Sequence, residues 1–144
     1  MPSIPARHRV AELRLRSAIV ARSSHIYWPA PTGPPRALLT LFEIDVPSRS
    51  LDLDVLCRTF STAGDFVVLA VRYELRPEQR PAMERDALRT LEWAAAHAAE
   101  VSADPDRLLI GGRGAGGALA TAVRRLAREQ GWPPILRQLT IPTL

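Results

Sequence analysis

The 144-residue sequence contains no lysine and no asparagine, a single cysteine, and only 6% aromatic residues. One cysteine, Cys57, excludes an internal disulfide and is compatible with a reducing cytoplasm, where we expect the protein to be located. No apolar run approaches the roughly 18 residues that a membrane-spanning helix needs, so we expect no membrane association. The first residues are basic but lack the continuous apolar core of a secretory signal.

Arginine alone carries the positive charge: 19 arginines stand against 15 acidic residues, for a net charge of +4. The arginines are scattered and interleaved with acids, and no basic stripe carries stacking aromatic residues, so we expect no nucleic-acid binding. Four acids, Glu43, Asp45, Asp52 and Asp54, are the nearest approach to a hard-metal site, but no ligand set closes among them and we interpret them as a solvated loop. The sequence therefore predicts neither a metal nor a cofactor.

Apolar periodicity indicates strands alternating with helices along the chain. Runs rich in β-branched and apolar residues predict strands, and apolar residues spaced by three and four predict helices. The predicted strands are 25–29, 37–42, 66–71, 107–112 and 136–141; the predicted helices cover about 53–60, 81–100 and 119–126, with a turn at 104–106. This order is typical of an α/β protein with a mostly parallel sheet and helices on both faces. We expect residues 1–24 to be an N-terminal segment and residues 25–144 to be the domain.

A glycine-rich loop, Gly112-Arg113-Gly114-Ala115-Gly116-Gly117, joins a predicted strand to a predicted helix. It formally matches the dinucleotide fingerprint G-x-G-x-x-G, whose amides hold a phosphate at a helix N-terminus. That fingerprint expects an acidic residue about 20 positions later, and the sequence from Gly131 to Leu144 contains none. The alternative is a nucleophile elbow, the sharp turn that lifts a serine above the sheet of an esterase.

The surrounding residues favour the elbow. The segment Arg72-Tyr73-Glu74-Leu75-Arg76-Pro77-Glu78 is followed by Pro81-Ala82, Glu84, Asp86-Ala87, Trp93 and Asp104-Pro105. Over residues 25–142 this pattern resembles the fold-3, hormone-sensitive-lipase-like carboxylesterases, which carry Asp-Tyr-Arg-Leu-Ala-Pro-Glu upstream of a Gly-Asp-Ser-Ala-Gly-Gly elbow. The resemblance implies a three-layer α/β-hydrolase sandwich.

The residues that the family uses for catalysis are replaced. Gly114 stands where the resemblance implies the nucleophilic serine, and glycine cannot form an acyl-enzyme. Glu43, Ile44 and Asp45 stand where it implies the glycines of the oxyanion loop. The triad acid and histidine follow the elbow in this fold, whereas the three histidines here all precede it. We expect no catalytic residues in this chain and interpret it as a truncated relative.

Three hypotheses about function remain open. The first is a non-catalytic hydrolase homologue that acts as an interaction or structural protein. The second is an enzyme on a small acyl substrate, complemented by a partner chain, and the third is phosphate or nucleotide binding at the glycine loop. The strand 136–141 would be an uncovered sheet edge, so we expect a homo- or hetero-oligomer formed through Leu136–Ile141.

Overall fold

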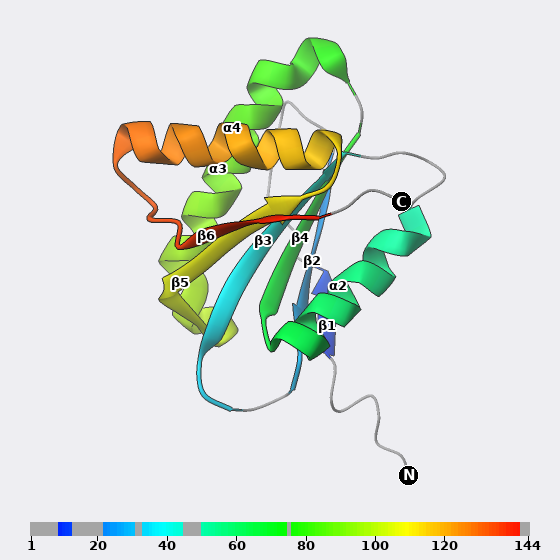
Figure 1. The fold of residues 1–144 in the computed structure, drawn as a ribbon, viewed down its shortest axis with the longest axis vertical. Helices are drawn as coiled ribbons and strands as arrows, with labels where there is room; N and C mark the ends of the chain where they lie inside the picture. The colour runs from blue at the N-terminus through cyan, green and yellow to red at the C-terminus, as the bar shows by residue number, and fades with distance from the viewer. Residues whose placement is uncertain (1–8, 13–21, 31–32, 45–49, 75, 142–144) are drawn as a thin grey trace.

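The computed structural model describes residues 9–12, 22–30, 33–44, 50–74 and 76–141. They form a six-stranded sheet in the order β1-β2-β4-β3-β5-β6 (Figure 1). The strands are β1 (Arg9–Glu12), β2 (Arg22–Trp28), β3 (Arg36–Ile44), β4 (Val67–Tyr73), β5 (Ala103–Gly112) and β6 (Arg137–Thr140). Strands β4, β3, β5 and β6 run parallel to one another, while β2 pairs antiparallel with both β1 and β4. The prediction of an α/β fold with a mostly parallel sheet is confirmed.

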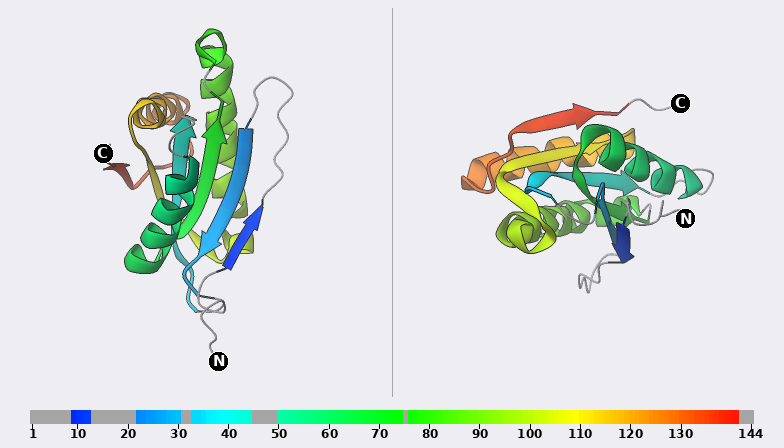
Figure 2. Two further views of the ribbon diagram at one scale, coloured as in Figure 1. Left: turned by 90° about the vertical axis from the view of Figure 1, so that its right-hand side faces the viewer. Right: turned by 90° about the horizontal axis from the view of Figure 1, so that it is seen from below.

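Among the described residues, three α-helices cover the sheet: α2 (Ser50–Gly64), α3 (Arg80–His97) and α4 (Ala115–Gln130). Helices α3 and α4 pack in one apolar cluster with one face of the sheet, and α2 packs in a second cluster with the other face (Figure 2). This is the three-layer sandwich that the resemblance implied. Strands β3 and β4 are buried on both faces, which explains their continuous apolar sequences.

The structure modifies several predicted boundaries. Asp104-Pro105-Asp106, predicted as a turn, lies within β5 as an irregular stretch, where Arg36 pairs with Ala103 but Leu38 already pairs with Leu108. The carboxylate of Asp104 accepts a hydrogen bond from the backbone N–H of Asp106 at 2.9 Å. This is the local bond that aspartate forms in turns, although the segment here belongs to a strand.

The sheet also extends toward the N-terminus. Strand β1 and the first residues of β2 fall within the expected N-terminal segment 1–24, and β1 pairs with β2 in the same sheet. The division of the chain at residue 25 stays a prediction. Among the described residues, no helix is both long enough and apolar enough to cross a membrane.

Candidate functional site at the strand-to-helix elbow

The ends of four parallel strands bring the candidate residues together. In the register of the sheet, Phe42 of β3 lies beside Gly112 of β5, and Ile44 of β3 lies beside Tyr73 of β4. Gly112 in turn lies beside Thr140 of β6. Because parallel strands direct their carboxyl ends to one edge, this edge is where ligands bind in open α/β sheets.

Gly114 forms the tip of a sharp turn between β5 and α4. Its backbone torsions are φ 55° and ψ −126°, a combination that is costly for a residue with a side chain and accessible to glycine. The helix begins immediately afterwards: Gly116 N–H donates to the Arg113 carbonyl at 2.9 Å, and Ala118 N–H donates to the Gly114 carbonyl at 3.1 Å. A Cβ built at Gly114 would meet no atom within 4 Å beyond its chain neighbours. The turn therefore has the shape of an elbow that presents position 114 to open space.

Two other glycines of the loop are required by close packing. A Cβ at Gly112 would lie 2.7 Å from the Phe42 carbonyl oxygen and closer still to the Gly116 backbone. A Cβ at Gly116 would collide with the same Phe42 oxygen. The backbone of α4 thus touches the ends of β3 and β5 directly, and only glycine permits this contact. The loop keeps the backbone framework of an elbow although its tip has no side chain.

A buried ion pair joins the turn to the end of β3. Arg113 Nη2 lies 2.9 Å from Glu43 Oε2, and Arg113 Nε lies 3.2 Å from both carboxylate oxygens. The side chains are only 11% and 6% exposed, respectively. Glu43 also lies beside Arg72 of β4 in the sheet register. The carboxylate is therefore held at the end of β3 by a fork of charge-assisted hydrogen bonds.

The retained motif residues Tyr73 and Asp86 connect the sheet to α3. The fully buried Tyr73 donates its hydroxyl to Asp86 Oδ2 at 2.7 Å, and its ring lies 6.5 Å from that of Phe42. This bond fixes the end of β4 against the helix that covers it. The resemblance to the carboxylesterase motif is thus carried here by residues with a structural role.

A hollow of about 390 Å³ lies beside the elbow, between the start of α4 and β6. Gly112, Gly114 and Gly117 line one side of it, and Gln138 and Thr140 line the other. The Gln138 side chain donates to the Thr121 hydroxyl at 2.9 Å, which connects β6 to α4. The hollow has the volume of a small ligand site, and its described lining contains no ionisable side chain.

The structure places the predicted site residues as follows. Gly112 to Gly117 form one continuous turn into α4, as expected for an elbow. Glu43 and Ile44 are the last residues of β3, both buried, and Asp45 lies outside the described residues. The interpretation of the acids around Glu43 as a solvated loop is wrong for Glu43, because this side chain is buried against Arg113. No group of three or more potential metal ligands gathers in the described part of the chain.

The sequence pattern does not predict the Glu43–Arg113 contact. Both residues were singled out separately, and their opposite charges at two loops that meet at one sheet edge were the available signal. A second buried group, Cys57 of α2, lies on the opposite face of the sheet with no exposed surface, as its apolar helix face predicted. Burial raises the pKa of its thiol to about 12.

A three-layer α/β sandwich with a glycine-framed elbow after β5 defines an α/β-hydrolase type of protein. The family model described as "alpha/beta hydrolase fold" matches residues 45–144. The chain therefore belongs to the α/β-hydrolase family, in its hormone-sensitive-lipase-like, fold-3 carboxylesterase branch, as the sequence resemblance predicted.

Its relatives include several esterases. Esterase LipI of Mycobacterium tuberculosis is 35% identical over 137 residues, which is 91% of this chain and 42% of that protein. Carboxylic ester hydrolase LipN of the same organism is 41% identical over 96 residues, covering 62% of this chain and 26% of LipN. Among solved structures, a bacterial heroin esterase superposes with a TM-score of 0.78 at 29% identity, over 96% of this chain and 45% of that one. The chain spans less than half the length of these relatives.

Proposed function

We propose that this chain is an α/β-hydrolase homologue that does not hydrolyse esters through its elbow. The observation that carries the proposal is Gly114 at the tip of the turn. The elbow backbone is present and position 114 faces open space, but the residue there has no nucleophilic atom. Without that atom no acyl-enzyme forms at this position, whatever groups surround it.

The ion pair at the end of β3 supports the same proposal. An esterase stabilises the negative oxygen of its tetrahedral intermediate with donors near the elbow. Here the buried carboxylate of Glu43 lies at the end of β3, and Arg113 directs two of its nitrogens to that carboxylate. An ionised carboxylate offers no hydrogen-bond donor to an oxyanion, and Arg113, which has donors, is engaged with this carboxylate.

The test is hydrolysis of p-nitrophenyl acetate and p-nitrophenyl butyrate, with labelling by a fluorophosphonate probe read by intact mass. We expect the rate to equal that of buffer and the mass to stay unchanged. The matched control is the Gly114→Ser variant, which supplies the hydroxyl and shows whether the remaining site can activate one. Turnover well above buffer that persists in independent preparations of the unaltered chain would overturn the proposal.

We propose that the chain acts instead as an interaction or structural protein, with strand β6 as its contact. β6 is the last strand of the sheet, so one side of it has no neighbour among the described strands. Leu136, immediately before β6, is 63% exposed. The backbone of an added strand, from a second copy or another protein, would form hydrogen bonds with this edge.

A cytoplasmic location is part of this proposal, and the single buried Cys57 fits it because that compartment keeps thiols reduced.

The hollow of about 390 Å³ beside the elbow favours a second candidate function, the binding of a small acyl or polar ligand, with a partner chain supplying any acid or base. A phosphate or nucleotide at the start of α4 is the remaining alternative for the same hollow. Thermal-shift measurements with butyrate, phosphate, ATP and NADP distinguish these ligands. A shift that Thr121→Leu abolishes would place a ligand in the hollow, because Thr121 lines it. Unchanged melting temperatures with all four would reject the candidate.

A further inference from the structure

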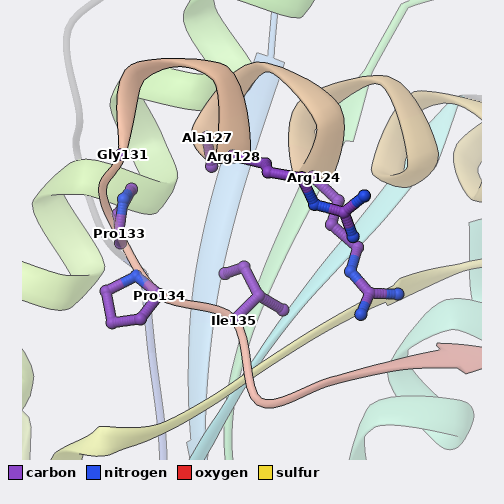
Figure 3. Close-up of a pocket in the computed structure, with 7 residues that line it drawn as sticks. All are labelled: Arg124, Ala127, Arg128, Gly131, Pro133, Pro134 and Ile135. Carbon is purple, nitrogen blue, oxygen red and sulfur yellow. The ribbon is translucent and has the colours of Figure 1, made fainter.

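A second hollow, of about 310 Å³, lies at the far end of α4 from the elbow (Figure 3). One wall is helix α4, and the other is the segment that leads from the helix to β6. The residues that line it are Arg124, Ala127, Arg128, Gly131, Pro133, Pro134 and Ile135. We propose that this hollow binds a small monocarboxylate with a short apolar tail, a site independent of the elbow and of the function proposed above.

The two arginines supply the charge. Arg124 and Arg128 lie one helical turn apart on α4, and Figure 3 shows both side chains entering the space between the helix and Ile135. Like charges at this spacing repel each other. The adjacent Arg125 has Glu129 as a partner at 4.0 Å, whereas within the described residues neither Arg124 nor Arg128 forms an ion pair. The negative end of the helix macrodipole relieves part of this repulsion at Arg128 only. An anion between the two guanidinium groups would relieve it for both.

The opposite wall is apolar and contains no competing acid. Pro133 is buried, Ile135 is half-buried, and the sequence from Gly131 to Leu144 has no aspartate or glutamate. The buried Ala127 of α4 also lines the hollow. The atoms of a bound anion that do not face the arginines would therefore contact apolar side chains. A ligand with a carboxylate at one end and a few methylene groups at the other matches both walls.

Hydrogen bonds hold both ends of the segment in place. Trp132 N–H donates to the Ala127 carbonyl at 3.0 Å, and Leu136 N–H donates to the Leu108 carbonyl of β5 at 2.8 Å. The Gln130 side chain donates to the Trp132 carbonyl and to Glu92 of α3. Because the wall is fixed before any ligand arrives, the ordering cost of binding falls mainly on the Arg124 and Arg128 side chains. Charge-assisted bonds from two guanidinium groups then select a carboxylate over a neutral group of the same shape.

The test uses the full chain, hexanoate as the probe and isothermal titration calorimetry at low salt. We expect hexanamide to bind at least about tenfold more weakly, since it loses a charge-assisted hydrogen bond. Arg124→Gln and Arg128→Gln should each weaken hexanoate by at least about tenfold, while Arg125→Gln on the same helix changes it by less than about twofold. Thermal melts of each variant show that it is folded.

Several outcomes would overturn the proposal. Equal binding of hexanoate and hexanamide would show that the arginines do not recognise the ligand. Unchanged affinity in the Arg124→Gln and Arg128→Gln variants would place the ligand elsewhere, and inorganic phosphate binding as tightly as hexanoate would remove the role of the apolar wall. The absence of heat up to roughly 10 mM hexanoate would reject the site.

Discussion

Arg113 at the elbow and Glu43 at the end of β3 form a buried ion pair, 2.9 Å between Nη2 and Oε2. The pair connects the two loops from which an esterase of this fold builds its nucleophile and its oxyanion donors. The two opposite charges face each other. Arg113 lies in the elbow, and Glu43 lies at the position that the resemblance assigns to the oxyanion loop. The edge of the sheet thus has a specific polar contact around a turn that has no nucleophile.

Removing one partner of this pair should be more costly than removing both. Arg113→Leu leaves the Glu43 carboxylate buried without its main partner, and we expect a loss of about 3 kcal/mol in the free energy of unfolding. Arg72, beside Glu43 in the register, keeps the loss toward the lower end of the usual range. The double variant Glu43→Leu/Arg113→Leu removes both charges and should lose roughly 1 kcal/mol or less. Urea denaturation of the unaltered chain, Arg113→Leu, Glu43→Leu and the double variant measures the coupling. Losses of the two single variants that add up to the loss of the double variant would show that the pair is not coupled.

Alanine at two glycines of the elbow should have clearly different effects. Gly114→Ala adds a methyl group in open space, so its cost is backbone strain alone, on the order of 1–3 kcal/mol. Gly116→Ala places the methyl group against the Phe42 carbonyl, and the sheet or the helix must move to accept it. We expect Gly116→Ala to be the more destabilised protein or to remain insoluble. Equal unfolding midpoints for the two variants would contradict the packing described for the elbow.

The sequence predicts the elements of this fold because their signals are local. The apolar run Phe66–Val71 and the glycine that ends α4, Gly131 with φ 84°, each determine structure within a few residues. Strand β1 was missed because its four residues carry no alternating pattern and are ordered by pairing with β2. The Glu43–Arg113 pair spans 70 positions, so periodicity and spacing contain no information about it. The elbow was predictable from its glycines, whereas the groups that face it depend on how β3 and β5 come together.

The buried thiol of Cys57 should make stability depend on alkaline pH. Its pKa is raised from 9.0 to about 12, first by burial, so the unfolded chain releases this proton while the folded chain retains it. The stabilising contribution is complete below about pH 9 and decreases at up to about 1.4 kcal/mol per pH unit as the pH rises toward 12. Burial also raises the pKa of Tyr27, which acts in the same direction.

Denaturation midpoints of the unaltered chain and of Cys57→Ala between pH 8 and pH 11 isolate this contribution. We expect a flatter pH profile in Cys57→Ala, with Tyr27→Phe flattening the profile further at the upper end. A thiol reagent such as DTNB should react with the native protein at pH 8 only as fast as the protein unfolds. Parallel pH profiles for the unaltered chain and Cys57→Ala would show that the thiol titrates normally in the folded state.

The contact proposed at β6 can be tested with two equally exposed apolar residues. Leu136 precedes β6 and Val55 lies on α2, and each is 63% exposed. If β6 is the contact, Leu136→Asp places a charge beside the edge that an added strand would approach, and charges at a strand edge oppose pairing. Light scattering after size exclusion should then show a lower average mass for Leu136→Asp than for the unaltered chain, and no change for Val55→Asp.

Both substitutions are at exposed sites, so the free energy of unfolding should stay within about 0.5 kcal/mol of that of the unaltered chain. A monomeric unaltered chain across the concentration range, or an equal effect of the two substitutions, would exclude this edge as the contact between copies of the chain, since the exposed fraction is the same and only the position differs.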